Sequence, residues 1–173
     1  MNYKIYSIIG ALFSIISGIL LHFAYDFFQT DFSAIFSATN ESTWEHLKLI
    51  FFPVMIFAII EYFIYGKNLS NFFASKITSL LIGMLAIVVV FYTYNGVIGE
   101  SSALFNILLF TGSVILAYWL YYIFINENLF TSPTVNKISI IVGIILFLMF
   151  WVFTFYPPLL NIFRDPVTGG YGI

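Results

Sequence analysis

Five long apolar stretches dominate the sequence and restrict its fold more than any other feature. They cover about 4–25, 48–65, 73–94, 102–125 and 138–156. Because a helix needs roughly 20 mostly apolar residues to cross a bilayer core, each stretch predicts one membrane span. The stretches are continuous instead of alternating, which favours helices over a transmembrane β-barrel. The second stretch reaches a comfortable length only if residues 41–47 belong to the same helix.

The composition supports the same fold class and excludes several functions. Only 8% of the residues are charged, whereas soluble proteins carry about 25%. The net charge of -2 argues against a nucleic-acid partner, and the absence of cysteine excludes disulfides and thiol chemistry. We therefore predict an all-α integral membrane protein, a single domain over 1–173 with the lipid bilayer as its main partner. A homo-oligomer remains an open alternative.

The basic residues predict the orientation of these spans. The first apolar stretch has no cleavage site, so we expect an uncleaved span with a cytoplasmic N-terminus. Lys48 and Arg164 then lie outside, and four lysines lie inside, in agreement with the positive-inside rule. The inside lysines are Lys4, Lys67, Lys76 and Lys137. In this topology the segment 26–47, the loop 95–101 and the tail 157–173 share the external face.

The most polar part of the chain is the run 40–48, which leads directly into the second span. Asn40 or Ser42 can cap a helix that begins here, because a short side-chain oxygen accepts hydrogen bonds from the free N–H groups of the first turn. Glu41 and Glu45 suit the first turns of such a helix, where the helix dipole is positive. We therefore expect a polar interfacial segment after the first span.

Five side chains form the candidate site: His22, Asp26, Glu41, Glu45 and His46. Imidazoles and carboxylates are common ligands of zinc and manganese. His22 and Asp26 are one helical turn apart, as are Glu41 and Glu45, so each pair is expected to share a helix face. His46 follows Glu45 directly and should point elsewhere. We assign His22, Asp26 and His46 as ligands of a divalent metal such as zinc, and Glu41 or Glu45 as general base.

The same residues have two other interpretations. In the first, the run is a hydrogen-bonded helix cap in which Glu45 pairs with Lys48 and a carbonyl or carboxylate satisfies His46. In the second, it is a clamp for a polar ligand. Further residues that we assign to the polar site or its cover are Asn40, Trp44, Lys48, Arg164 and Asp165.

The tail 157–173 is too rich in glycine, proline and polar residues to form a sixth span. Asp165-Pro166 and Gly169-Gly170 predict turns. The tail is either flexible or a lid, and in the lid Arg164 would form a bidentate ion pair with Glu41 or Glu45.

Two features within the predicted spans concern helix packing and an intramembrane charge. Gly10, Ser14 and Gly18 repeat every four residues and predict close helix packing. This row drifts by about 40° per step on a 3.6-residue helix, so it supports an inward-facing His22 better than an inward-facing Asp26. Glu61 is an intramembrane carboxylate, for which we expect snorkelling or a pair with Lys67.

Three motifs resemble a known family. They are Leu21-His22-Phe23-x-Tyr25, the run Asn40-Glu41-Ser42-Thr43-Trp44-Glu45-His46-Leu47-Lys48-Leu49, and the ending Phe163-x-Asp165-Pro166-x-Thr168-Gly169-x-Tyr171-Gly172-Ile173. Together they are similar to a DUF6512-like family of small bacterial multipass membrane proteins of unknown function. The resemblance spans nearly the whole chain and implies a protein of the bacterial plasma (inner) membrane. It implies no activity and no catalytic residues.

Three functions follow as hypotheses. The first is a metal-dependent membrane enzyme, such as a hydrolase of lipid-like substrates, with the metal near the extracytoplasmic face. The second is a small-molecule-binding component of a transporter, for example for a vitamin, although such components usually have six spans. The third is a structural or regulatory membrane protein in which the polar run only stabilises a helix.

Overall fold

The computed structural model describes residues 2–173, and every element in this range is helical. Five helices are long and apolar enough to cross a membrane, which confirms the predicted fold class and the five spans. They are α1 (Tyr3–Phe28), α3 (Thr43–Ile64), α4 (Phe72–Ile98), α5 (Ala103–Asn126) and α6 (Pro133–Phe155). The short elements are α2 (Asp31–Phe36), η1 (Gly66–Asn68) and η2 (Asn161–Phe163).

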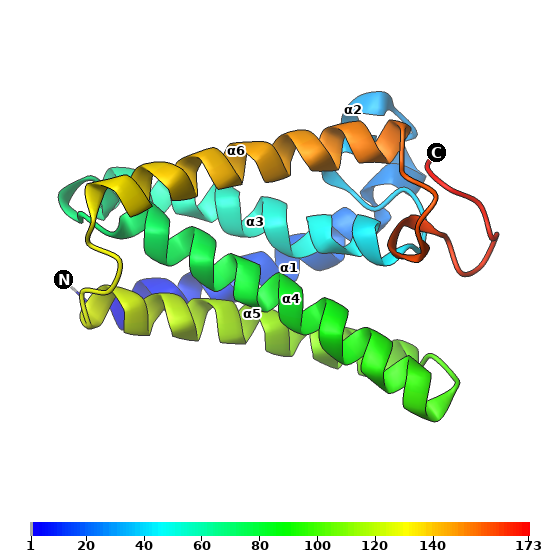
Figure 1. The fold of residues 1–173 in the computed structure, drawn as a ribbon, viewed down its shortest axis with the longest axis horizontal. Helices are drawn as coiled ribbons and strands as arrows, with labels where there is room; N and C mark the ends of the chain where they lie inside the picture. Colours follow the sequence, from blue (N-terminus) through cyan, green and yellow to red (C-terminus); the bar gives the residue numbers. More distant parts are fainter. Residues whose placement is uncertain (1) are drawn as a thin grey trace.

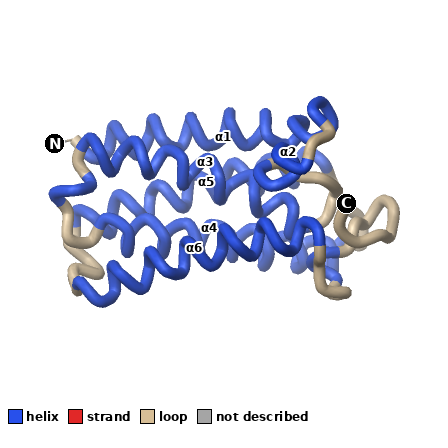
Figure 2. Tube along the Cα trace, turned by 90° about the horizontal axis from the view of Figure 1, so that it is seen from above, coloured by secondary structure: helices blue, strands red, loops and turns tan. Residues whose placement is uncertain are grey.

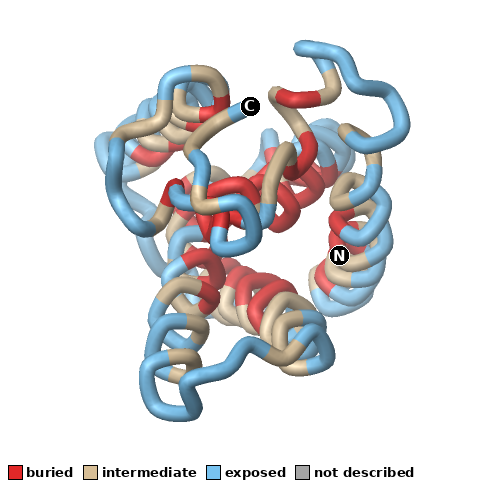
Figure 3. Tube along the Cα trace, turned by 90° about the vertical axis from the view of Figure 1, so that its right-hand side faces the viewer, coloured by how far each residue is buried: buried red, intermediate tan, exposed pale blue. Residues whose placement is uncertain are grey.

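The long helices form one bundle around α3 (Figures 1 and 2). In the most apolar part of α3, 61% of the residues are buried, against 22% in α1, α5 and α6. Helices α1, α5 and α6 therefore keep most of their apolar surface for lipid, whereas 50% of the corresponding part of α4 is buried. In the end-on view the buried segments gather at the centre of the bundle (Figure 3). The polar run 40–48 leads into this central helix.

Consecutive helices run in opposite directions, so the connections divide between the two ends of the bundle (Figure 1). One end holds the N-terminus and the connections α3–α4 and α5–α6. The other end holds the segment between α1 and α3, the α4–α5 loop and the C-terminal tail. We call this second end the site end. The polar segments that the sequence grouped on one face do lie at a common end.

Helix α3 begins one residue after Ser42, whose hydroxyl accepts a hydrogen bond from the Glu45 N–H at 3.3 Å. Ser42 is therefore the cap, and Asn40 supports it by accepting from the Ser42 N–H at 2.9 Å. Because the helix starts at Thr43, Glu41 precedes it. The expectation that Glu41 and Glu45 share a helix face is wrong for this reason.

Close contact between α1 and α3 depends on the small-residue row. Gly10, Ser14 and Gly18 are all buried. Pro53 lies inside α3 and has no N–H, so it leaves the carbonyl of Leu49 without its usual helical donor. A side chain at position 18 would collide with this carbonyl. Glycine at 18 thus allows α1 to approach α3 closely, one turn before His22.

The segment between α1 and α3 folds back as α2. Thr30 and Ser33 form a capping box at its start, since each side chain accepts a hydrogen bond from the other residue's backbone N–H. Ala34 is fully buried and its carbonyl accepts a hydrogen bond from Lys48 Nζ at 2.8 Å, whereas Phe32 is 74% exposed. One side of α2 is therefore tied to α3, and the other is available to the membrane interface.

A buried ion pair lies at the opposite end of the bundle. Glu61 and Lys76 are 2.6 Å apart and almost completely buried. Tyr65 donates a hydrogen bond to Glu61 at 2.5 Å, and Lys76 Nζ lies 3.2 Å from the centre of the Tyr121 ring. The expected snorkelling of Glu61, or a pair with Lys67, is wrong. Lys67 is exposed in η1 beyond the end of α3, whereas the antiparallel α4 returns Lys76 beside Glu61.

Candidate metal site

Three side chains from different parts of the chain meet at the site end. His22 comes from the last third of α1, Glu41 from the loop before α3, and His46 from the first turns of α3. One ligand atom of each lies within 4.8 Å of the other two. The Nε2 atoms of the histidines are 3.2 Å apart, and Glu41 Oε2 lies 3.5 Å from His46 Nε2. Glu41 Oε1 is 3.9 Å from His22 Nε2.

A backbone contact orients His46. Its Nδ1 lies 2.9 Å from the carbonyl oxygen of Ser42, which can only accept. His46 therefore carries a proton on Nδ1 and, when neutral, presents the lone pair of Nε2 toward His22. Metal-bound histidines commonly donate their second ring N–H to a backbone carbonyl in this manner. The cap residue of α3 thus also fixes the ring that could bind a metal.

The spacing of these atoms fits a single metal ion. Zinc binds nitrogen and oxygen at about 2.0–2.2 Å in tetrahedral geometry, which separates neighbouring ligand atoms by about 3.3–3.6 Å. The distances from His46 to His22 and to Glu41 are 3.2 and 3.5 Å. The Glu41 side chain is 51% exposed, so a small rotation can shorten its 3.9 Å distance to His22. Three protein ligands would leave a fourth position for water or substrate.

Asp26 does not join this cluster. It lies one turn after His22 on α1 and is exposed, and it is absent from the group of converging ligand atoms. The four-residue step explains the difference, because it carries Asp26 about 40° farther around the helix than His22. The metal-ligand assignment of Asp26 is therefore not supported by the geometry.

Glu45 is close to the site in sequence but belongs to a separate, buried network. Its carboxylate accepts from Lys48 Nζ at 2.5 Å, from the Thr39 N–H at 3.0 Å and from the Thr154 hydroxyl at 3.1 Å. Lys48 is completely buried and also donates to Thr154 at 2.9 Å. Glu45 is thus occupied as an acceptor, and the pair with Lys48 is the one that the helix-cap interpretation expected.

Trp44 is part of the core and not of the polar site. Its side chain is 7% exposed and packs in tilted geometry against Phe150 of α6, at 4.7 Å between ring centres, and against Phe163 of η2, at 4.9 Å. Trp44 therefore connects α3 with α6 and with the tail. Its contribution to the site is to anchor η2 next to the cap of α3.

The tail packs on the site end, but not through the residue that the sequence suggested. Arg164 is exposed and donates to the Gly169 carbonyl at 3.4 Å, so the expected ion pair with Glu41 or Glu45 is not formed. Asp165 is buried instead, and its carboxylate accepts from the Val167 N–H at 2.9 Å and the Thr168 hydroxyl at 2.7 Å. Internal hydrogen bonds therefore give the tail its shape.

These hydrogen bonds also determine the charge of Asp165. Burial by itself raises the pKa of this carboxyl, but the hydrogen bonds from Thr168 and Val167, together with the nearby backbone N–H of Glu41, lower its pKa below the ordinary value. A carboxyl with a lowered pKa in the folded state stabilises the fold above its unfolded pKa. The stabilisation is lost as the pH falls through the folded pKa. Asp165 is thus ionised at neutral pH.

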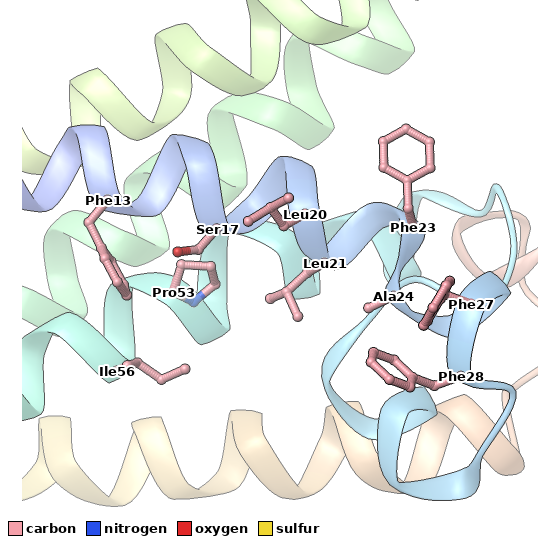
Figure 4. Close-up of a pocket in the computed structure, with 10 residues that line it drawn as sticks. All are labelled: Phe13, Ser17, Leu20, Leu21, Phe23, Ala24, Phe27, Phe28, Pro53 and Ile56. Atoms are coloured by element: carbon pink, nitrogen blue, oxygen red, sulfur yellow. The ribbon is translucent and has the colours of Figure 1, made fainter.

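An apolar groove of about 480 Å³ runs along α1, and none of the three cluster residues lines it. Figure 4 shows Phe13, Ser17 and Leu21 of α1 above Pro53 and Ile56 of α3. From Phe13 to His22 the helix advances nine residues, which corresponds to two and a half turns. His22 therefore does not line the groove, but Phe23, which does, has its ring 5.0 Å from that of His22.

The sequence did not reveal Thr39, the Ser42 carbonyl or Thr154 as partners of the polar run. Thr154 lies 109 residues after Glu45, near the end of α6, in an otherwise apolar stretch. Its only signal is a hydroxyl within a span, which is usually explained by a hydrogen bond to its own helix. The Phe150 carbonyl lies 2.8 Å from the Thr154 hydroxyl, so the single hydroxyl proton is shared between this carbonyl and the Glu45 carboxylate.

Fold and site together define an all-helical, five-span membrane protein with a cluster of two histidines and one glutamate at one end of the bundle. Comparison with known protein families identifies the family within this class. The chain belongs to DUF6512, a family of unknown function, whose profile matches residues 1–173. The family resemblance of the sequence motifs is thereby confirmed. No curated protein and no solved structure matches the chain.

Proposed function

We propose that the protein binds a divalent metal ion through His22, His46 and Glu41 and uses it to activate water for hydrolysis of a lipid-like substrate. The convergence of the three ligand atoms within 4.8 Å carries this proposal. Two histidines and one glutamate are the ligand set of several zinc hydrolases, and such sites keep a fourth position open. A metal in this position lowers the pKa of bound water toward neutrality.

The contacts of each residue indicate its role in this proposal. His22 and His46 supply neutral nitrogen ligands, and the Ser42 carbonyl keeps His46 in the required tautomer. Glu41 is the carboxylate that contacts both histidines, and its exposure allows it to adjust to an ion. Glu45 would have to leave Lys48 and Thr39 before it could take a proton, so we give it no catalytic role.

The surroundings of the site support an amphiphilic substrate. The ring of Phe23 lies 5.0 Å from that of His22 and is 60% exposed. Large exposed aromatic side chains continue from there through the end of α1 into α2. They are Phe27, Phe28 and Phe32. Large apolar side chains that stay exposed mark surfaces that contact a membrane or another protein, so a site beside these rings at the end of the bundle would meet lipid headgroups and their linkages to the acyl chains.

We place the site end outside the bacterial plasma membrane. Four of the six basic residues lie at the opposite end, while six of the eight acidic residues lie at the site end or in its connections. Positive residues favour the cytoplasmic side. The chain has no cysteine, so single Glu100→Cys and Lys67→Cys variants can report topology in intact cells. A membrane-impermeant maleimide should label only the Glu100→Cys variant, and the reverse pattern would invert the orientation.

The metal content of the purified protein tests the proposal most directly. We expect a stoichiometric divalent ion in the wild type and its loss in both His22→Ala and His46→Ala, because each removes one of three ligands. Asp26→Ala is the matched control, since Asp26 is exposed and one turn from His22 but outside the cluster. Metal analysis after dialysis against zinc, together with a check of folding, gives the result.

Two outcomes would contradict parts of the proposal. A folded wild type that retains no zinc, manganese or other divalent ion would exclude the metal site, and the polar run would then be a helix cap. A metal that binds as expected, but leaves phospholipid and fluorogenic lipid esters uncleaved, would exclude the hydrolase and keep the metal site.

A further inference from the structure

The C-terminal tail forms a compact loop next to the candidate metal site. The Asp165 N–H donates to the Gly170 carbonyl at 3.0 Å, and the Gly169 N–H donates to the Asp165 carbonyl at 2.8 Å. Gly169 has a φ of 75°, in the left-handed region that favours glycine. An antiparallel bridge between Arg164 and Tyr171 closes the loop. The tail thus has a defined shape with which it can hold other residues.

This loop contacts Asn40, the residue directly before Glu41. The buried carboxylate of Asp165 closes the loop by accepting from the Val167 N–H and the Thr168 hydroxyl, and it lies near enough to the backbone N–H of Glu41 for that group to help lower its pKa. The Asn40 side chain donates to the Gly172 carbonyl at 3.0 Å and accepts from the Ser42 N–H at 2.9 Å. Hydrogen bonds therefore lead from the tail to the loop that carries Glu41.

Glu41 needs such support more than the two histidines do. His22 and His46 are held by helices α1 and α3, whereas Glu41 lies before the first residue of α3 and its side chain is half exposed. A ligand on an unsupported loop must be ordered when the metal binds, and this ordering weakens affinity. Outer residues that orient metal ligands typically change metal affinity by about 10–100-fold when they are replaced.

Resting on the proposed metal site, we infer that Asp165 and Asn40 are positioning residues through which the tail holds Glu41 in place for the metal. Neither side chain contacts the histidines, so both act through the backbone of the 40–42 loop. The tail thereby couples Gly172 to the metal affinity of the site through Asn40, which lies 132 residues earlier in the sequence.

The Asp165→Asn variant tests this inference. We expect zinc affinity to fall by about 10–100-fold, the range for outer-shell replacements, in competition with a chromophoric chelator in detergent. Glu100→Gln is the matched control, because Glu100 is an exposed acidic residue in the α4–α5 loop at the same end. Asn40→Ala should also weaken binding, and it serves if Asp165→Asn does not fold.

A double-variant cycle separates positioning of Glu41 from a general effect on the fold. In a Glu41→Ala background, Asp165→Asn should cause no further loss of zinc affinity. An equal loss in both backgrounds, or wild-type affinity in the single Asp165→Asn variant, would overturn the inference and leave the metal site standing. A folded wild type without zinc affinity would instead overturn the proposed function and this inference with it.

Discussion

Replacing Lys76 with methionine is expected to destabilise the protein by about 3–5 kcal/mol, the cost of breaking a buried ion pair from one side. Glu61 and Lys76 are 0% and 1% exposed and 2.6 Å apart. Without Lys76, the Glu61 carboxylate would remain in an apolar interior with only the Tyr65 hydroxyl to satisfy it. The free energy of unfolding in mixed detergent micelles measures the effect.

Removing both charges should reverse most of this loss. Replacing a complete buried ion pair with apolar residues of similar volume is often neutral or stabilising, so Glu61→Leu combined with Lys76→Met should be near the wild type. Lys67→Met is the control, because Lys67 is exposed and should change stability by less than about 0.5 kcal/mol. A Lys76→Met variant as stable as the Lys67→Met variant would show that the buried pair is not formed.

The Lys76→Met variant should leave metal binding unchanged in the folded protein. Glu61 lies in the last turn of α3 and His46 in the first turns, so nearly the whole length of the helix separates the pair from the metal cluster. The residues between them are mainly apolar and buried, such as Phe51, Val54 and Phe57. Loss of zinc in the folded Lys76→Met protein would contradict this independence of the two polar clusters.

Replacing Glu45 with alanine should likewise cost about 3–5 kcal/mol, again because a buried charge loses its partner. Lys48 would remain completely buried, and the Thr39 N–H would lose its acceptor. Despite this large loss, the folded Glu45→Ala protein should retain its metal. Glu41→Ala should show the opposite result, with weak metal binding and little loss of stability, because Glu41 is half exposed.

This comparison decides between the two interpretations of Glu45. Unfolding free energy and metal content, measured on the same preparations, separate a structural residue from a ligand or base. A Glu45→Ala protein that keeps its stability but loses metal or activity would assign Glu45 to the chemistry. The double variant Glu45→Leu with Lys48→Met should recover stability if the buried pair causes the loss.

The apolar stretches predicted the five-span bundle because membrane insertion depends on local composition. About 20 apolar residues satisfy the bilayer core whatever the rest of the chain does, so each span could be recognised by itself. Likewise, the alternating direction of successive spans places residues 26–47 and the tail at one end without any knowledge of packing. The drift of the row Gly10, Ser14 and Gly18 also favoured His22 over Asp26 as an inward residue.

The partners of the charged residues, in contrast, were decided only by the tertiary structure. Glu61 pairs with Lys76 and not with Lys67 because α4 packs beside α3 in one register, and nearly uniform apolar helices do not encode that register in their sequence pattern. Glu41 and Glu45 look equivalent in the sequence. They are separated because the cap at Ser42 starts the helix between them, leaving Glu41 in the loop beside the histidines and placing Glu45 on α3 against Lys48.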